Sequence, residues 1–387
     1  MARKEKLIVA GAIAAHPIGG GGNAWAFLQY VLGFRALGFD VAYYEEIAPE
    51  RCIDAAWRPC AFAASANLAF LHAVAERFGF ADRFFLSCRD GSGTSAGLSR
   101  RDAERFAAQA SLLVNLSGRF HDEEILGRVA RRMYIDLDPG FTQIWQERYG
   151  VDMNLSRHDV YCTVGLNLSA PDCRVPRCQR PWHSTVPPVV LEHWPVAEMP
   201  GTAWTTVADW RGYSPVEWQG QWYGQKSEEF LKVLDLPRKV PATLELCLAI
   251  HPAEPDLEGL IAHGWKLTSP AEHCADPDAY RRYVRSSRGE FSVAKNGYVV
   301  GRTGWFSDRS ACYLAAGLPV VVQDTGISPH LPVGRGLLTF RTKDEAAEAL
   351  REVERDYASH RRAARALAEE VFASHVVLPR LLALAGL

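Results

Sequence analysis

The chain has 387 residues, of which 48% are hydrophobic and 23% charged, and its formal net charge at pH 7 is −2. This length predicts two domains rather than one, and the composition is that of a globular protein. A net charge near zero excludes a chain-wide attraction to nucleic acid or to anionic membranes, so we expect neither as a partner.

The sequence predicts a cytoplasmic protein without a transmembrane segment. The apolar run Leu7–Ala15 leads into a glycine loop rather than a signal-peptide cleavage site, so we interpret it as the start of a buried strand. No apolar run approaches the roughly 20 residues that cross a bilayer. The nine Cys residues have irregular spacing and no CxxC pair, which indicates free thiols in a reducing compartment.

Strands and helices are predicted to alternate along the N-terminal half. A strand over 7–12, the glycine loop 16–23, a helix over 24–37 and a strand over 39–44 make one Rossmann-type unit. The later predicted elements are helices over 63–78, 101–110 and 122–132, strands over 112–116, 133–137 and 160–164, and a helix ending near 148. We expect a doubly wound sheet whose ligands lie at the carboxyl ends of the strands.

The C-terminal half follows an irregular stretch rich in Pro and Trp, residues 167–206, which indicates the connection between two domains. Its predicted helices span 227–234, 256–263, 277–286, 343–359, 361–373 and 376–384, and its predicted strands span 244–250, 265–268 and 336–340.

Residues 291–326 carry the strongest indication of function. After a short strand, a loop with Lys295 and Gly304 leads into a helix that begins near Ser307 and ends at Gly317. A buried strand over 319–323 and a turn complete the stretch. A glycine-bearing loop that enters a helix beside Lys and Arg favours a phosphate, because the free N–H groups and the positive end of the helix dipole point there.

This stretch resembles the donor half of a GT-B fold glycosyltransferase, closest to the bacterial glycosyltransferase family 1 / family 4-like group. The run Tyr313–Val322, YLAAGLPVVV, is similar to the run that ends the diphosphate-holding helix in such enzymes. The resemblance implies two Rossmann-like α/β domains facing a cleft. Residues 1–200 would form the acceptor domain, 201–365 the donor domain, and 366–387 a C-terminal helix that packs back on the first domain.

The same resemblance implies a nucleotide-sugar donor as substrate, an unidentified acceptor, and no metal or other cofactor. The cations expected at the diphosphate are Lys226, Lys295 and Arg309. The other expected donor contacts are Gly304, Ser307, Asp308, Ser310, Asp324 and Thr325, together with Gly20, Gly21 and Gly22 from the first glycine loop. Each cation is alternatively a solvated surface charge, and the segment 324–326 is alternatively an ordinary turn.

The resemblance fails at one point. Many family-4 enzymes carry two glutamates eight residues apart, the second of which holds the ribose, and here those positions are Gly304 and Cys312. Ribose recognition must therefore differ, and the polar residues left for it are Ser307, Asp308 and Arg309.

His16 is the sharpest catalytic candidate, because it follows the first strand where many inverting GT-B enzymes place a general base. Imidazole exchanges protons near neutrality, although His16 is alternatively a structural residue of the loop. Asp90, Asp136 or Asp138 would orient it. Asp138 is alternatively a helix cap before Pro139, and Asp136 and Asp138 together mimic the metal-binding Asp-x-Asp pair of another enzyme class.

Three functions remain open. The first is a glycosyltransferase, the second is a GT-B-fold sugar-nucleotide epimerase, and the third is a non-catalytic nucleotide-sugar binding module. A nicotinamide oxidoreductase is disfavoured, because the first glycine loop has the wrong spacing. The nucleotide, the sugar, the acceptor, the stereochemical course and the oligomeric state are not determined by the sequence.

Overall fold

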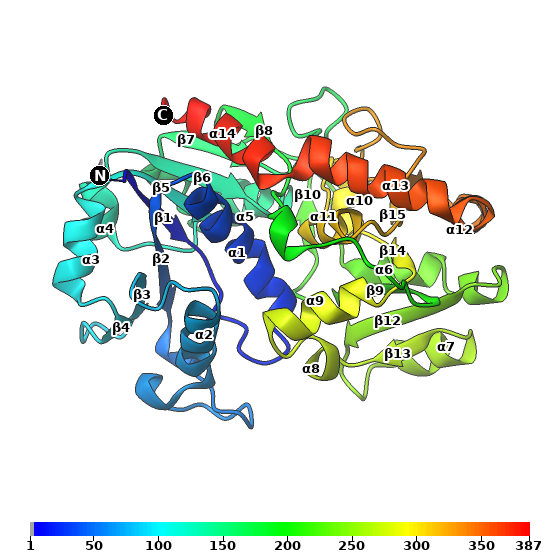
Figure 1. Cartoon of the computed structure of the whole chain (residues 1–387), viewed down its shortest axis with the longest axis horizontal. Coiled ribbons are helices and arrows are strands. Elements are labelled where there is room, and N and C mark those ends of the chain that lie inside the picture. The colour runs from blue at the N-terminus through cyan, green and yellow to red at the C-terminus, as the bar shows by residue number, and fades with distance from the viewer. Residues whose placement is uncertain (1–3) are drawn as a thin grey trace.

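The computed structural model describes residues 4–387, so the first three residues of the predicted N-terminal domain lie outside it. Two α/β lobes lie side by side, and both the first strand, β1 (Lys6–Ala10), and the last helix, α14 (Ser374–Leu384), lie on the side of the N-terminal lobe (Figure 1). Each lobe has a mostly parallel sheet with helices packed on it, which confirms the predicted doubly wound architecture. Within residues 4–387, no helix combines the length and the apolar character needed to span a membrane.

The N-terminal lobe is built on an eight-stranded sheet in the order β4-β3-β2-β1-β5-β6-β7-β8, parallel except for the β3–β4 pair. Its strands are β1 (Lys6–Ala10), β2 (Asp40–Ile47), β3 (Phe84–Cys88), β4 (Ser95–Gly97), β5 (Ala110–Leu116), β6 (Arg132–Asp136), β7 (Val160–Thr163) and β8 (Trp182–Ser184). Its helices are α1 (Gly21–Ala36), α2 (Ala66–Arg77), α3 (Arg100–Ala107), α4 (Glu123–Arg128) and α5 (Phe141–Tyr149).

Strand β1 is apolar throughout because both of its faces are covered. Leu7 and Val9 pack into the core that includes α1 and α2, whereas Ile8 and Ala10 pack into the core that includes α3 and α4. Successive side chains of a strand point to opposite faces, so a strand covered on both sides reads as a continuous hydrophobic run.

The C-terminal lobe is built on a six-stranded parallel sheet in the order β13-β12-β9-β14-β15-β16, with a separate antiparallel hairpin. The sheet strands are β9 (Ala203–Asp209), β12 (Thr243–Ala249), β13 (Lys266–Thr268), β14 (Gly289–Ser292), β15 (Val320–Gln323) and β16 (Leu337–Phe340), and the hairpin is β10 (Val216–Trp218) and β11 (Gln221–Tyr223). The helices are α6 (Lys226–Lys232), α7 (Asp256–Ala262), α8 (Pro270–His273), α9 (Pro277–Arg285), α10 (Asn296–Gly301), α11 (Asp308–Ala315), α12 (Lys343–Arg355), α13 (Tyr357–Leu367) and α14 (Ser374–Leu384).

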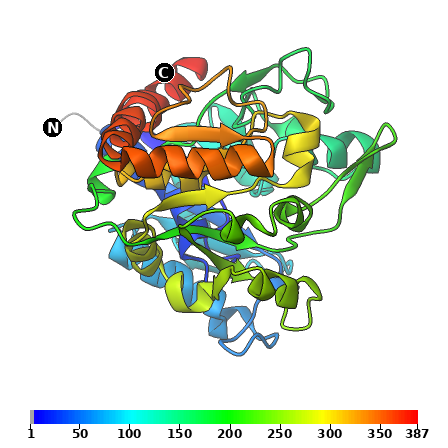
Figure 2. The same ribbon diagram turned by 90° about the vertical axis from the view of Figure 1, so that its right-hand side faces the viewer.

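Helix α12 crosses one face of the second sheet (Figure 2) and packs on β15 and β16. Helix α13 and a π-helical turn over Ala368–Phe372 then carry the chain back to the N-terminal lobe. There α14 packs on α1, and the side chains of Ser374 and Leu378 lie against Gly33. The last helix thus braces the first lobe, while the predicted boundaries at 200/201 and 365/366 stay predictions.

Several elements differ from the predicted set. The structure adds helix α8 and the strands β3, β4, β8, β9, β10 and β11, none of which was predicted. Strand β8 and most of β9 lie within residues 167–206, so the stretch interpreted as an irregular connection contributes a strand to each sheet. Residues 296–301, predicted as loop, form helix α10. Gly297 is tolerated inside α10 because its neighbours leave no room for a side chain, since a Cβ there would lie 2.6 Å from the ring of Phe141. The first part of the loop that was expected to cradle phosphate is therefore a helix, whereas residues 303–307 remain non-helical.

Candidate functional site

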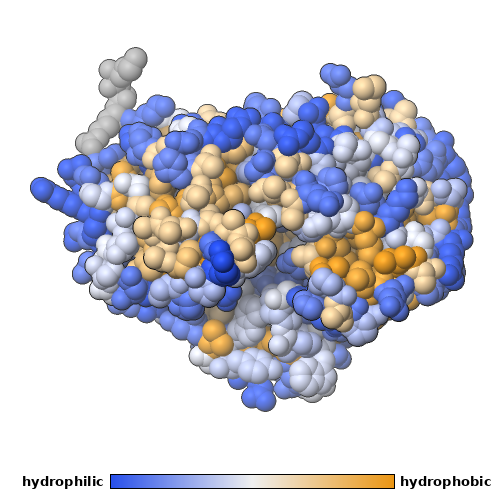
Figure 3. Space-filling view, turned by 90° about the horizontal axis from the view of Figure 1, so that it is seen from below, coloured by the Kyte–Doolittle hydropathy of each residue, from blue (hydrophilic) through white to orange (hydrophobic). Residues whose placement is uncertain are grey.

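Two cavities lie in the cleft between the lobes, and together they hold the residues that are candidates for chemistry. The larger has a volume of about 680 Å³ and the smaller about 430 Å³. Both are lined by His16 of the N-terminal lobe and by Asp209 and Lys226 of the C-terminal lobe. Seen from below, the surface is hollowed between the two lobes (Figure 3). The cleft thus offers two adjoining compartments that meet at one histidine.

His16 lies in the loop that follows β1, at the carboxyl edge of the first sheet, as predicted. Part of its side chain is open to the cleft, but the cleft walls remove water from it, and this desolvation lowers the pKa of His16. The charge of Asp209 opposes the shift, whereas Arg119 and Arg51 add to it. His16 is therefore a neutral imidazole at neutral pH, the form that accepts a proton.

The backbone immediately before His16 is held by a buried carboxylate on β2. Glu45 Oε2 accepts a hydrogen bond from the Ala14 N–H at 2.9 Å, and Oε1 accepts one from the Ala15 N–H at 3.0 Å. The Tyr43 hydroxyl donates to Glu45 at 2.7 Å. Burial raises the pKa of Glu45 to about 7, although these hydrogen bonds lower it. Glu45 thus positions the loop that carries His16, a role that the sequence did not reveal.

Lys226, the first residue of α6, reaches both cavities. No hydrogen bond or ion pair engages its ammonium group within residues 4–387. Burial lowers its pKa to about 7, with further lowering by Arg309 and Lys295 and an opposing effect of Asp209. An unpaired, half-buried cation in a cleft is suited to meet an anion from solution. The predicted cation at position 226 therefore lies in the cleft.

The start of α11 lines the smaller cavity through Ser307, Asp308 and Arg309. The Ser307 side chain accepts a hydrogen bond from the Arg309 N–H at 3.2 Å, as expected of an N-cap. Burial raises the pKa of Asp308, although Arg309 lowers it. Ser310 does not line either large cavity, and its hydroxyl is buried. The helix end that the sequence placed at the donor does face the cleft.

Arg309 is engaged within the C-terminal lobe. Its Nε donates to Glu290 Oε1 at 2.6 Å, one terminal nitrogen donates to the Val207 carbonyl at 2.7 Å, and the other donates to Ser292 Oγ at 2.7 Å. A guanidinium committed in this way acts on a ligand through its charge rather than through a new pair of hydrogen bonds. Of the two predicted cations Lys226 and Arg309, Lys226 is therefore the one whose side chain has no partner in the described chain and faces the cleft.

Lys295, predicted to lie at the diphosphate, and Asp138, predicted as a residue that could orient His16, form one ion pair across the lobes. Lys295 Nζ lies 3.2 Å from each carboxylate oxygen of Asp138 and within about 5 Å of the rings of Phe141, Tyr213 and Tyr298. The hydroxyls of Tyr213 and Tyr298 also donate to Asp138. Both charged groups line the larger cavity, but each already has its counter-charge.

Asp136 does not reach the cleft. Its two carboxylate oxygens accept hydrogen bonds from the Asp138 N–H, Thr142 Oγ1, Gln143 Nε2 and Thr163 Oγ1 at 2.8–3.0 Å. Burial raises its pKa, and these donors lower it. Asp136 therefore holds the β6–α5 turn instead of orienting His16. The carboxylate whose charge acts most strongly on His16 is Asp209, which was not among the predicted partners.

The glycines of the first loop allow the two lobes to approach closely. Gly19, Gly20 and Gly22 line the smaller cavity, and Gly21, which begins α1, donates its N–H to the Cys274 carbonyl at 2.8 Å. A Cβ at Gly21 would lie 2.1 Å from the Asp276 carbonyl oxygen. These glycines thus serve contact between the lobes, and their predicted approach to a donor stays a prediction.

The remaining predicted donor contacts lie away from the cavities. Gly304 has φ +74° and packs against the backbone of Asn167. Asp324 pairs with Arg341 at 2.7 Å and accepts the N–H groups of Gly326 and Ile327, while Thr325 donates to the Trp305 carbonyl. These three residues are engaged in holding the turns around α11.

The larger cavity has an N-terminal wall that the sequence interpretation missed. It carries Arg51, Arg89, Arg119 and His121, which follow the carboxyl ends of β2, β3 and β5. A signal was present, because each residue comes shortly after an apolar run, and the carboxyl edge is where a doubly wound sheet binds its ligands.

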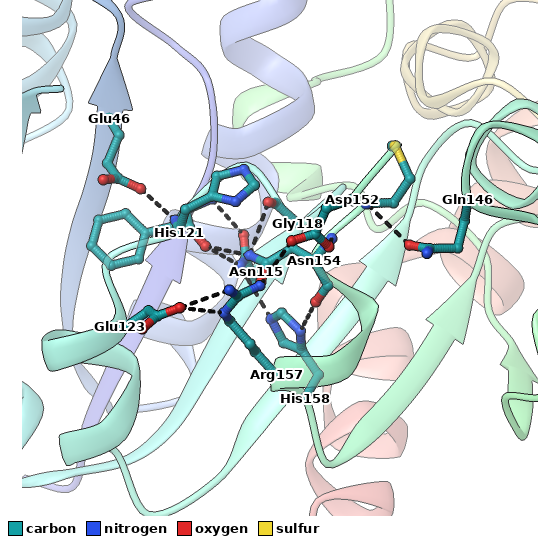
Figure 4. A network of polar contacts seen from close by, with 12 residues as sticks. Glu46, Asn115, Gly118, His121, Glu123, Gln146, Asp152, Asn154, Arg157 and His158 are labelled. Carbon is teal, nitrogen blue, oxygen red and sulfur yellow. Dashed lines mark hydrogen bonds and ion pairs between the residues drawn. The ribbon is translucent and has the colours of Figure 1, made fainter. Parts of the chain in front are cut away.

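Polar contacts hold the loop that presents Arg119 and His121 (Figure 4). Asn115 pairs with both the N–H and the carbonyl of Phe120 at 3.1 and 2.8 Å, and Asn154 Nδ2 donates to the same carbonyl at 2.7 Å. Glu46, on β2, accepts the N–H groups of His121 and Asp122. Because the Phe120 side chain between them is fully buried, the two neighbouring residues are presented at the cavity on a fixed backbone.

His158 contacts Asn115 and Asn154, the two residues that hold this loop, and it does so as a neutral imidazole. Its Nε2 lies 3.1 Å from Asn115 Nδ2, and its Nδ1 lies 2.9 Å from the Asn154 carbonyl oxygen. Burial lowers the pKa of His158 to about 4. The amide therefore donates to Nε2, and Nδ1–H donates to the carbonyl. Within residues 4–387, no group of three or more His, Cys, Asp or Glu side chains is arranged to hold a metal ion.

Comparisons with known proteins agree with this architecture. Residues 247–385 match a family model described as glycosyl transferase-like. No curated protein sequence matches the chain. A structure of Anabaena HepE with UDP and glucose has a TM-score of 0.57 at 12% identity, covering 99% of this chain and 100% of that one.

Two further solved structures are similar over nearly the full length of both chains. The pneumococcal O-GlcNAc transferase GtfA, in complex with UDP and GlcNAc, has a TM-score of 0.57 at 7% identity, with coverage of 99% of each chain. Sucrose-phosphate synthase from Thermosynechococcus elongatus has a TM-score of 0.52 at 11% identity, covering 98% and 97%. These likenesses confirm the GT-B fold, and the family match confirms the glycosyltransferase resemblance of the C-terminal half.

Proposed function

We propose that this GT-B chain, whose C-terminal half is glycosyl transferase-like, transfers a sugar from a nucleoside diphosphate sugar to an acceptor bound at the N-terminal lobe. The observation that carries the proposal is the meeting of two cavities at His16, Asp209 and Lys226. A transferase needs a donor and an acceptor compartment that share the reacting atoms, and the two volumes of about 430 and 680 Å³ suit two separate substrates.

The smaller cavity is proposed to hold the donor. Its walls combine the unpaired ammonium of Lys226, the first turn of α11 and the backbone of Gly19, Gly20 and Gly22. Free N–H groups and a cation stabilise a diphosphate and, more strongly, the negative charge that grows on it as it leaves. UDP is the proposed nucleotide, because the HepE and GtfA structures contain it. Asp308 is the proposed acceptor of hydrogen bonds from donor hydroxyls.

His16 is proposed as the general base. The acceptor hydroxyl loses its proton to the neutral imidazole while its oxygen forms a bond to the anomeric carbon. The bond from that carbon to the diphosphate oxygen breaks, and the nucleoside diphosphate leaves with the electron pair, stabilised by Lys226. The charge of Asp209 favours the imidazolium that forms. This chemistry requires no metal ion, and we propose that the enzyme works without one.

The test is turnover with UDP-, GDP- and dTDP-sugars, followed by NMR with and without a mixture of candidate acceptors. Release of the nucleotide, with slow transfer to water when no acceptor is present, supports a transferase. An isomerised nucleotide sugar without acceptor would instead establish the epimerase, and binding without any turnover would establish the binding module. Turnover that is unchanged by EDTA supports metal independence.

A variant pair makes this test specific to the cleft. Lys226→Met should lose most of the turnover, because it removes the cation beside the leaving group. Lys266→Met is the matched control, since Lys266 is exposed on β13 and lines neither cavity. Equal activity of the two variants would contradict the proposed donor position.

A further inference from the structure

Three arginines stand on the N-terminal wall of the larger cavity. Arg51, Arg89 and Arg119 follow β2, β3 and β5, which are close neighbours in the sheet order β3-β2-β1-β5. Within the part of the chain that the structure describes, none of the three side chains makes a hydrogen bond or an ion pair. Many arginines of this lobe are paired, as Arg100 is with Asp122 and Arg132 with Asp159. Arg101, Arg131 and Arg174 are also unpaired in the described chain, but they line neither cavity of the cleft.

The three guanidinium groups act on the same small region. Burial is the main cause of the lowered pKa values of His16 and His121, but Arg119 lowers both, Arg51 lowers that of His16, and Arg89 lowers that of His121. The electrostatic effect of a charge falls off with distance, so the three guanidinium groups lie near the two imidazoles. Positive charge therefore gathers beside the proposed base, where the charge of Asp209 opposes it.

Two carboxylates, Glu46 and Glu50, share this wall with the three arginines, so the wall keeps an excess of positive charge, and neither is ion-paired with them within the described chain. Glu46 accepts the N–H groups of His121 and Asp122; burial raises its pKa, and the charge of Arg89 is one of the effects that oppose this. Across the cavity, Gln225 is buried and its Nε2 has no hydrogen-bond partner in the described chain. Three unpaired cations and a buried N–H donor without a partner in the described chain thus line one cavity, and this lining suits a ligand with a negative charge and several acceptor oxygens.

Hydrogen bonds hold the backbone at Arg89 and Arg119 in a fixed position at the cavity wall. Arg119 lies on the loop that Asn115, Asn154 and Glu46 hold in place (Figure 4). Arg89 donates its N–H to the Ile47 carbonyl at 2.9 Å, which ties the end of β3 to the end of β2. A fixed backbone reduces the entropy lost when flexible side chains close on a ligand.

We propose that the acceptor carries a phosphate monoester, which Arg51, Arg89 and Arg119 bind in the larger cavity while the acceptor hydroxyl reaches His16. This proposal rests on the proposed function. A carboxylate has one charge and two oxygens, which a single arginine satisfies with a two-pronged contact. A phosphate monoester carries about −1.5 to −2 charges and three acceptor oxygens at neutral pH, and three guanidinium groups match it.

The experiment measures binding to protein that is saturated with UDP, so that the donor cavity is already filled. The probes are inorganic phosphate, glucose 6-phosphate, glucuronate and glucose, which compare a phosphate, a phosphate ester, a carboxylate and a neutral molecule. Inorganic phosphate and glucose 6-phosphate should bind, and replacing any one of the three arginines by Gln should weaken them about tenfold. Vesicles of phosphatidylcholine, with and without phosphatidic acid, distinguish a lipid-borne phosphate from a soluble one.

Two controls separate the possible failures. Arg105→Gln should change nothing, because Arg105 lies on the surface, paired with Asp102. Arg→Lys variants at the three positions keep the positive charge without the two-pronged hydrogen bonding of the guanidinium group, and they should lose less affinity than the Arg→Gln variants.

UDP binding in the same samples reports on the donor site alone, so a loss of UDP binding would contradict the proposed function. If UDP binds but no phosphate probe shows arginine-dependent binding, or if glucuronate binds as tightly, the phosphate assignment is wrong.

Discussion

Lys295 of the C-terminal lobe lies 3.2 Å from both carboxylate oxygens of Asp138 of the N-terminal lobe. The pair is about one-fifth exposed on each side and is enclosed by Tyr213 and Tyr298. It joins the β6–α5 turn to the residue that precedes α10 across the floor of the cleft. The geometry favours a role in fixing the two lobes relative to each other.

Lys295→Met should therefore destabilise the protein by about 1–3 kcal/mol, because Asp138 is left without its counter-charge. Asp138→Asn should have a similar effect, and the double variant should lose clearly less than the sum of the two. Urea unfolding measures these free energies. The surface pair Lys239–Asp344, in which Asp344 is 84% exposed, is the control and should contribute little. Additive effects at 295 and 138 would show that the pair is not coupled.

The second prediction concerns the pH dependence of UDP binding. Burial holds the pKa of Lys226 at about 7 in the free protein, and a bound diphosphate raises it. Binding then takes up a proton above pH 7, so affinity should be highest below pH 7 and fall as pH rises through it. Lys226→Arg should keep its charge and abolish this fall, whereas Lys226→Met should lose about 10- to 100-fold in affinity at low pH.

Calorimetry at about pH 6 and about pH 8.5 is the measurement. UDP titrates in the same region, and the Lys226→Met variant corrects for this because it retains the ligand's own pH dependence. If wild type and Lys226→Met differ by the same factor at both pH values, Lys226 does not titrate on binding.

The third prediction concerns His16. His16→Gln removes the base but keeps a polar side chain at the junction of the two cavities. It should lower kcat by about 10²–10⁴-fold and leave the affinity for UDP within a few-fold of wild type. A fall in UDP affinity with little change in kcat would instead assign His16 to substrate binding. The pH–rate profile gives a second readout, because its acidic limb should disappear with the imidazole.

The fourth prediction concerns the contact between the lobes. A Cβ at Gly21 would lie 2.1 Å from the Asp276 carbonyl oxygen, so Gly21→Ala should force the lobes apart and destabilise the protein by about 1–3 kcal/mol. Gly127→Ala is the matched control, because nothing lies within 4 Å of its Cβ and alanine favours a helix. Thermal unfolding should show a loss for the first variant and a small gain for the second.

The sequence predicted the elements that alternate regularly and missed those that depend on distant partners. The strand at Leu7–Ala10, the helix ending before Gly38 and the helix start at Ser307 all follow local signals, and the structure has them. Helix α10 was not predicted because glycine is typical of loops, and Gly297 and Gly301 both lie in this segment. In the structure the two glycines leave room for the side chains of Phe141 and Tyr223. Local propensity cannot anticipate a neighbour from another part of the chain.

The same limit applies to the site. Lys226 and His16 lie in the cleft, where the resemblance put them, whereas Arg309 is paired with Glu290 and Asp136 is enclosed by the β6–α5 turn. A charged residue looks the same in sequence whether its partner is a ligand or a buried side chain. Arg51, Arg89 and Arg119 were detectable in principle, because each follows a strand of the N-terminal sheet.

The most direct measurement is a crystal structure of the protein with UDP. Our account predicts the diphosphate in the smaller cavity, between Lys226 Nζ and the first turn of α11, with the larger cavity beside His16 left open. A diphosphate outside the cleft, or one bound there with Lys226 turned away, would contradict the assignment of the donor site and with it the proposed transfer.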